Sequence, residues 1–171
     1  MSEQDQPSLV ARLLRATAAV EDAILVLLLA AMILLAGAQI VLRNLAGGGF
    51  LWADSLLRVL VLWVGLLGAV AATRSDKQIT VDALSRLLPP RGRAAARVVT
   101  DLFTTAVSLF LGFHSARLVL DERAAGTIAF ASVPTWVCEL VLPVAFTVIG
   151  VRYLLLAITH LREAATKEVE A

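Results

Sequence analysis

The sequence predicts an all-α integral membrane protein that crosses the bilayer four times. Hydrophobic residues make up 59% of the 171 residues and charged residues 17%, against about 45–50% and about 25% in soluble domains. The mean hydropathy is +0.84, and the apolar residues gather in four long stretches. A soluble globule of this length has too small a core to hide so much apolar surface. A soluble enzyme, a secreted disulfide scaffold and a nucleic-acid binder are therefore poor explanations of the composition.

The four spans form one predicted domain covering residues 1–171, and they lie at about residues 23–42, 56–73, 98–120 and 134–161. The first span is uncharged, and its one polar side chain is that of Gln39. At about 1.5 Å per residue its length is about 30 Å, which matches the hydrocarbon core of a bilayer. The fourth span contains Pro143, which is expected to kink the helix.

A shorter segment follows the second span. Ser75 and Gln78 form a capping-box pattern, and apolar residues then recur at helical spacing as far as Leu88, before two prolines. The segment is too short and too polar to cross a bilayer. We expect an amphipathic helix at 75–88 that lies in the membrane interface, and the alternative is a solvated loop.

The lysine and arginine residues predict the orientation. The two termini and the middle connection carry ten of these residues, and the other two connections carry three when Arg117, at the outer end of the third span, is counted with them. The positive-inside rule therefore places both termini and the middle connection in the cytoplasm. Trp52 and Trp136 then fall at the outer ends of the second and fourth spans, as in an aromatic belt, whereas Trp63 lies mid-span and is expected to pack against another helix.

The chain lacks the motifs that catalysis and cofactor binding require. It has no G-x-S-x-G, H-E-x-x-H, Walker A or dinucleotide-binding pattern. Cys138 is the single cysteine and is expected to fill space in a helix, while His114 and His160 lack the spacing of metal ligands. The sequence therefore predicts no enzyme activity, no cofactor and no metal centre.

Charged residues inside the spans are the first candidates for a functional role. Arg58 follows Asp54 by one helical turn, so the two can pair locally while Arg58 extends to the headgroups. The alternatives are contact between Arg58 and another subunit or a bound lipid, or contact with a transported substrate. Glu139, near the outer end of the fourth span, is expected to face a partner or water, and Asp101 lies near the inner end of the third.

Small residues recur four apart in the second span, as Gly65 with Ala69 and Gly68 with Ala72, and in the third as Gly112 with Ala116. Such faces allow close approach of a helix from the same chain or from another chain. Four helices enclose little room for an alternating solute pathway, which transporters build from larger repeats. An accessory or scaffold subunit is the better interpretation.

The residues around the second span resemble the signature of the DctQ-type small membrane subunit of TRAP (tripartite ATP-independent periplasmic) transporters. The resemblance rests on Trp52, Asp54, Arg58, Trp63, Leu67-Gly68-Ala69, Arg74, Gln78 to Asp82 and Leu84, followed by Ser132 to Trp136 and Pro143. Where the family commonly has two acidic residues and a histidine, this chain has Asp54, Ser55 and Gln78.

The resemblance implies a small scaffold subunit in the bacterial inner membrane, within a sodium-coupled transporter that imports a carboxylate-type organic solute. The implied partners are a large DctM-type membrane subunit, a DctP-type periplasmic solute-binding protein and membrane lipids. From the residues alone, a stand-alone four-helix structural or sensing protein is the alternative. The candidate contacts with lipid or with the large subunit are Trp52, Asp54, Arg58, Trp63, Gly68, Asp82, Trp136 and Glu139.

Overall fold

A computed structural model describes residues 9–74 and 90–169 of the chain. Within these ranges, four helices are long and apolar enough to cross a membrane: Ala16–Leu45, Leu51–Ala72, Ala95–Ala125 and Thr135–Arg162. The predicted all-α class with four apolar helices is confirmed. The amphipathic helix predicted at 75–88 lies outside the described residues, and the cytoplasmic placement of the termini stays a prediction.

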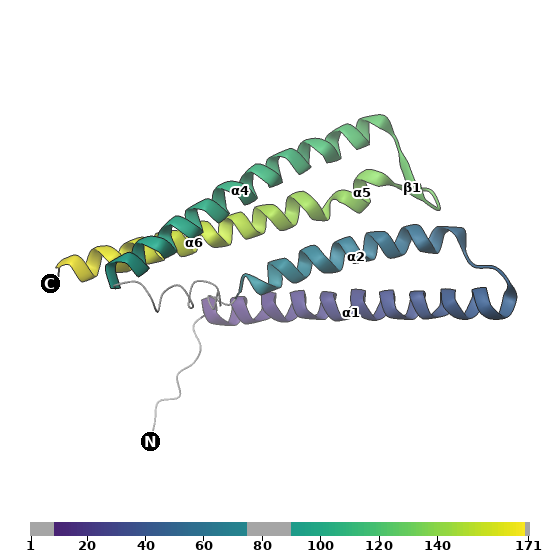
Figure 1. The fold of residues 1–171 in the computed structure, drawn as a ribbon, viewed down its shortest axis with the longest axis horizontal. Helices are drawn as coiled ribbons and strands as arrows, with labels where there is room; N and C mark the ends of the chain where they lie inside the picture. The colour runs from purple at the N-terminus through teal and green to yellow at the C-terminus, as the bar shows by residue number, and fades with distance from the viewer. Residues whose placement is uncertain (1–8, 75–89, 170–171) are drawn as a thin grey trace, which may run out of the picture. The chain divides into compact units, whose positions relative to one another are not determined.

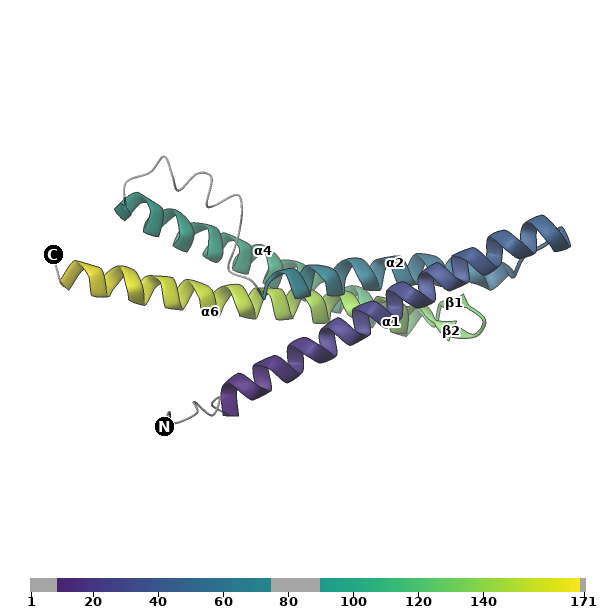
Figure 2. The same cartoon turned by 90° about the horizontal axis from the view of Figure 1, so that it is seen from below.

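The chain divides into two compact units, Met1–Ala71 and Ala72–Ala171. The first unit is a helical hairpin made of α1 (Leu9–Ala46) and α2 (Leu51–Ala72) (Figure 1). Gly47 follows the last residue of α1 with φ +66°, a left-handed conformation that ends helices and that glycine adopts without steric cost. The two helices separate with distance from this connection (Figure 2).

The second unit is also a hairpin, with a more elaborate connection. Its first long helix is α4 (Pro90–Ala125), and a two-stranded antiparallel ribbon of β1 (Ile128–Phe130) and β2 (Val133–Pro134) follows (Figure 2). The chain then continues into the short helix α5 (Thr135–Glu139) and the long helix α6 (Val141–Val169). The sequence predicted only a connection between the third and fourth spans and not this ribbon, which is too short to leave a pattern of alternating residues.

The fourth predicted span is interrupted near its start. The helix α5 ends at Glu139 and α6 begins at Val141, so Leu140 separates them. Pro143 explains the position of this break, because proline has no N–H to donate to the carbonyl four residues earlier, that of Glu139. Pro143 falls in the first turn of α6, where the N–H has no partner within the helix in any case. The predicted kink therefore takes the form of a break between two helices.

One face of α4 packs along α6. The buried positions on α4 recur at intervals of three or four residues, which places them on one side of the helix: Asp101, Thr105, Ser108, Gly112, Ser115 and Val119. Most of these residues are small or polar. The hydroxyls of Thr105 and Ser115 donate to the carbonyls of Asp101 and Leu111 on their own helix, at 2.8 and 2.7 Å. Because their bonds are satisfied locally, these side chains can face α6 without a partner on it.

The two helices approach closely where one of them has a glycine. A Cβ atom on Gly150 would lie 2.9 Å from Cδ2 of Leu109, and one on Gly112 would lie 3.3 Å from Oγ1 of Thr147. Gly112 therefore approaches a helix of its own chain. The other glycines of the predicted close-contact faces differ, since a Cβ on Gly65 or Gly68 would have no atom within 4 Å.

The outer faces of the long helices are apolar and open. Exposed side chains include Phe103, Phe110 and Phe113 on α4 and Leu27 and Leu34 on α1. Among the described residues, no large side chain is completely buried. This inversion of a soluble fold, with small and polar residues inside and large apolar residues outside, is what a hydrocarbon solvent requires.

The close approach at Gly150 predicts opposite effects for two glycine-to-alanine substitutions. Alanine is the better helix former by about 1 kcal/mol, but at Gly150 the added methyl group displaces Leu109, and overpacking costs about 1–3 kcal/mol. We expect Gly150→Ala to lower the free energy of unfolding by about 1 kcal/mol, and Gly68→Ala to leave it unchanged or raise it. Denaturant unfolding in detergent micelles measures both variants. A Gly150→Ala variant as stable as Gly68→Ala would contradict the packing described for α4 and α6.

Candidate functional site

At the connected ends of α1 and α2, one side chain forms both hydrogen bonds that the backbone of a neighbouring strand would form. Nε2 of Gln39 donates to the carbonyl oxygen of Phe50 at 2.9 Å, and the N–H of Phe50 donates to Oε1 of Gln39 at 3.1 Å. Gln39 is buried, with 4% of its surface exposed. A Cβ on Gly49 would lie 2.8 Å from Oε1 of Gln39, so a larger residue there would displace the Gln39 amide. The one polar residue of the first span thus closes the hairpin.

An ion pair lies beside this closure. Nη2 of Arg43 is 2.5 Å from Oδ2 of Asp54, and both side chains are exposed. The expected pair of Asp54 with Arg58 is absent among the described residues, because Arg43 reaches across the hairpin to the same carboxylate. Arg58 is exposed one turn further along α2. Spacing within one helix correctly identified Asp54 as half of an ion pair but named the wrong partner.

The tryptophans of the first unit differ in their surroundings. The Trp52 ring stacks on Phe50, with centroids 5.5 Å apart and an interplanar angle of 29°. Trp52 is 40% exposed at the start of α2, which suits a residue in the interfacial belt. Trp63 is half-buried in the middle of α2, and its expected contact with a further helix stays a prediction.

The remaining candidate residues of the second unit lie on α5. The Arg123 guanidinium lies over the Trp136 ring, with Cζ 5.4 Å from the ring centroid, so this cation–π contact ties the end of α4 to α5. Glu139 is half-buried, and its Oε2 atom has no hydrogen-bond partner among the described residues. Asp82, the last candidate from the sequence, lies outside the described residues.

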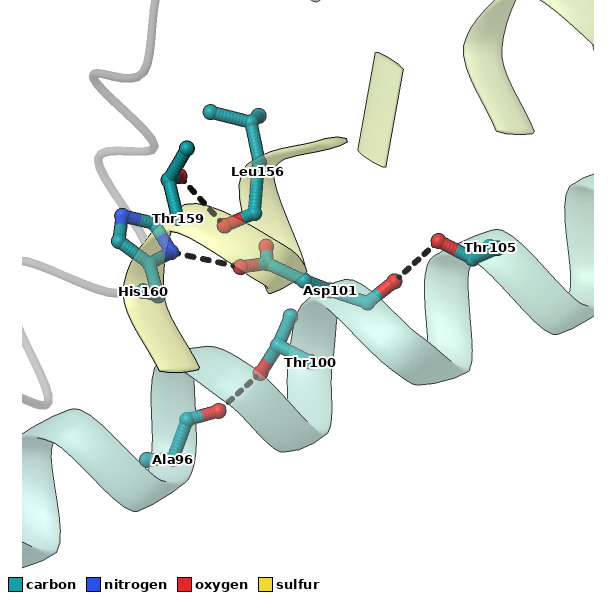
Figure 3. Close-up of polar contacts among 7 residues, drawn as sticks. All are labelled: Ala96, Thr100, Asp101, Thr105, Leu156, Thr159 and His160. Carbon is teal, nitrogen blue, oxygen red and sulfur yellow. Dashed lines mark hydrogen bonds and ion pairs between the residues drawn. The ribbon is translucent and has the colours of Figure 1, made fainter. Parts of the chain in front are cut away.

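A polar pair links the far ends of α4 and α6. Nδ1 of His160 lies 2.8 Å from Oδ2 of Asp101, and the two side chains are 11% and 8% exposed (Figure 3). The backbone carbonyl of Asp101 accepts the Thr105 hydroxyl, so both polar groups of Asp101 are engaged. The two residues are 59 positions apart in the sequence, so no local pattern could predict that they pair. The only sequence signal was that each residue is a polar side chain near the same predicted end of a span.

These polar contacts hold helices together and do not form a reaction centre. Among the described residues, no group of three or more His, Cys, Asp or Glu side chains could hold a metal ion. The ion pair at Asp54 and the pair at Asp101 each join two helices of one hairpin. This arrangement can hold the helices in a fixed alignment and expose charged side chains at the ends of the spans.

A family model describing the DctQ component of tripartite ATP-independent periplasmic transporters matches residues 32–163. The chain is 30% identical over 125 residues to the ectoine TRAP transporter small permease protein TeaB of Halomonas elongata, an alignment that covers 72% of this chain and 65% of TeaB. It is 33% identical over 75 residues to a putative TRAP transporter small permease protein of Haemophilus influenzae, covering 44% and 47% of the two chains.

A third similar protein is the sialic acid TRAP transporter permease protein SiaT of Haemophilus influenzae. The identity is 30% over 77 residues, which are 45% of this chain and 12% of SiaT. The chain thus aligns with about two thirds or less of the length of each relative. The match agrees with the topology and motif resemblance found in the sequence.

The hairpin closure predicts that Gln39→Leu destabilises the first unit. The substitution leaves the N–H of Phe50 without its partner and the Phe50 carbonyl with the N–H of Ala53 alone, at a cost of about 1–3 kcal/mol. We expect amide hydrogen exchange at Phe50 and its neighbours to speed up by about tenfold or more, as measured by mass spectrometry in lipid nanodiscs. Asn44→Ala is the matched control, because its amide donates only to Ile40 on its own exposed helix face. Equal exchange in the two variants would mean that Gln39 does not hold the connection.

The two interhelical pairs predict unequal coupling energies. A double-mutant cycle at Asp101 and His160 should give a coupling of about 1–3 kcal/mol, because the pair is shielded and charge-assisted. The same cycle at Arg43 and Asp54 should give less than about 1 kcal/mol, because both side chains are exposed. Unfolding of the alanine single and double variants in micelles provides the values. A larger coupling energy at the exposed Arg43–Asp54 pair would mean that burial does not strengthen the Asp101–His160 contact.

Proposed function

The chain belongs to the DctQ component family of tripartite ATP-independent periplasmic transporters, and from this premise we propose that it is the small permease subunit of such a transporter. The observation that carries the proposal is the family match over residues 32–163, which includes the whole of α2, α4 and α5. The expected place of action is the bacterial inner membrane, and four apolar helices are consistent with it.

We propose a supporting role for the subunit. Several buried polar residues between α4 and α6 are engaged with their own helix or with the facing helix, as Thr105 and Asp101 are. A solute pathway needs polar groups that are open to an aqueous cavity and can exchange partners. The described helices instead offer fixed contacts and long apolar faces. These features support a scaffold against which a larger subunit moves.

The proposed partners are a large DctM-type permease subunit and a DctP-type periplasmic solute-binding protein. The alignment with SiaT supports the first partner, because the 77 aligned residues make up only 12% of that permease protein. In SiaT, a segment similar to this chain is therefore covalently joined to a much longer permease. We propose that the same association is non-covalent here.

For the solute, we propose an organic compound with a carboxylate, imported together with sodium ions. The relatives are named for ectoine and for sialic acid, so permease proteins similar to this chain belong to transporters with different solutes. The choice of solute then belongs to the large subunit and the binding protein.

Co-purification tests the proposed function. An affinity-tagged copy expressed in its native host and extracted in mild detergent should retain a large permease at a constant ratio. Deletion of the gene should abolish sodium-dependent uptake of the solute that the binding protein of the same transporter takes up. The extraction control is an equally tagged, unrelated membrane protein from the same host. A chain that migrates alone, together with unchanged uptake in the deletion strain, would identify a stand-alone membrane protein instead.

A further inference from the structure

Arg58 is a positively charged side chain on an exposed face of a membrane-spanning helix. It belongs to α2, seven residues after the helix begins at Leu51. Within the described residues, no carboxylate or other polar group contacts its guanidinium. We propose that Arg58 binds the phosphate group of a membrane phospholipid, whose acyl chain lies along the exposed face of α2.

The carboxylate that would otherwise neutralise Arg58 is already occupied. Asp54 lies one turn before Arg58 and is held by Arg43 at 2.5 Å. The bonds between Gln39 and Phe50 close the hairpin beside this pair and keep Arg43 within reach of α2. The end of the hairpin therefore contains two arginines and one carboxylate, and the charge of Arg58 is left over.

The position of Arg58 along α2 places its guanidinium at the surface of the bilayer. The helix has 22 residues, or about 33 Å at about 1.5 Å per residue, which is close to the thickness of the hydrocarbon core. Leu51 thus marks one boundary, and Arg58 lies about 10 Å inside it. Helical side chains point back toward the N-terminus of their helix, which here is the nearer boundary. A long arginine stem can therefore extend to the phosphate layer.

The face of α2 that continues from Arg58 into the bilayer suits an acyl chain. Exposed positions recur on that side of the helix at intervals of three or four residues, at Val61, Gly65, Ala69 and Ala72. A Cβ on Gly65 would have no atom within 4 Å. These side chains are short, so an acyl chain can lie close to the backbone below a headgroup bound by Arg58.

A phospholipid phosphate satisfies the chemistry of this site. A guanidinium presents two parallel N–H groups that match two oxygens of a phosphate, with stronger bonds than neutral pairs form. Phosphate groups are present all along the boundary that Arg58 reaches, whatever the orientation of the chain. Binding of this kind needs only a bilayer and does not depend on a transport partner.

Native mass spectrometry of the purified full chain tests the site. The chain is released from detergent and titrated with phosphatidylglycerol, phosphatidylethanolamine and a diacylglycerol of the same acyl chains. We expect one phospholipid of either headgroup to bind, and the diacylglycerol, which lacks phosphate, not to bind. Arg58→Gln should weaken phospholipid binding about tenfold or more. Arg58→Lys should give an intermediate affinity, since lysine keeps the charge without the paired N–H groups.

Arg123→Gln is the matched control, because it removes the same charge from a guanidinium already engaged by the Trp136 ring. It should leave binding of the phospholipid unchanged. Equal binding by the wild type and Arg58→Gln, or equal losses in Arg58→Gln and Arg123→Gln, would overturn the proposal. A variant Arg58→Gln that keeps its phospholipid but loses a co-purifying permease would also overturn it and would assign Arg58 to an acidic side chain of that protein.

Discussion

A polar group inside a hydrocarbon layer must find its partner within the protein, and this constraint determines where the polar residues of the chain lie. Backbone bonds are satisfied by the four long helices. Side chains follow the same rule in two ways. Hydroxyls such as that of Thr105 return to their own helix. Longer groups reach another part of the chain: Gln39 binds Phe50 in the connection before α2, and Asp101 binds His160 on the neighbouring helix.

The two hairpins use these contacts differently. The first is closed at its connection by Gln39 and by the Arg43–Asp54 pair, and its helices then separate. The second is packed along its length through Gly112 and Gly150, with a polar pair at the end opposite to its connection. The second hairpin is therefore the more closely packed element. The first exposes more of its surface to lipid or to a partner, which suits the proposed role as a scaffold.

Much of this architecture could be predicted from the sequence, because hydropathy and breakers act locally. The four spans and the disturbance caused by Pro143 each follow from a short stretch of sequence. The contacts between helices could not be predicted in the same way. The Asp101–His160 pair depends on how two helices align across 59 residues, and Arg43 reached Asp54 because the hairpin closes tightly. For Arg58 and Glu139, the sequence identified unusual positions but not what they contact.

Transport by reconstituted components tests the central claim, that this chain supports a permease and does not itself carry the solute. Proteoliposomes would contain this chain alone, the large permease alone or both, with the loaded binding protein outside and a sodium gradient imposed. The scaffold role predicts uptake only when both membrane subunits are present. Uptake by this chain alone, or full uptake by the large permease without it, would contradict the claim.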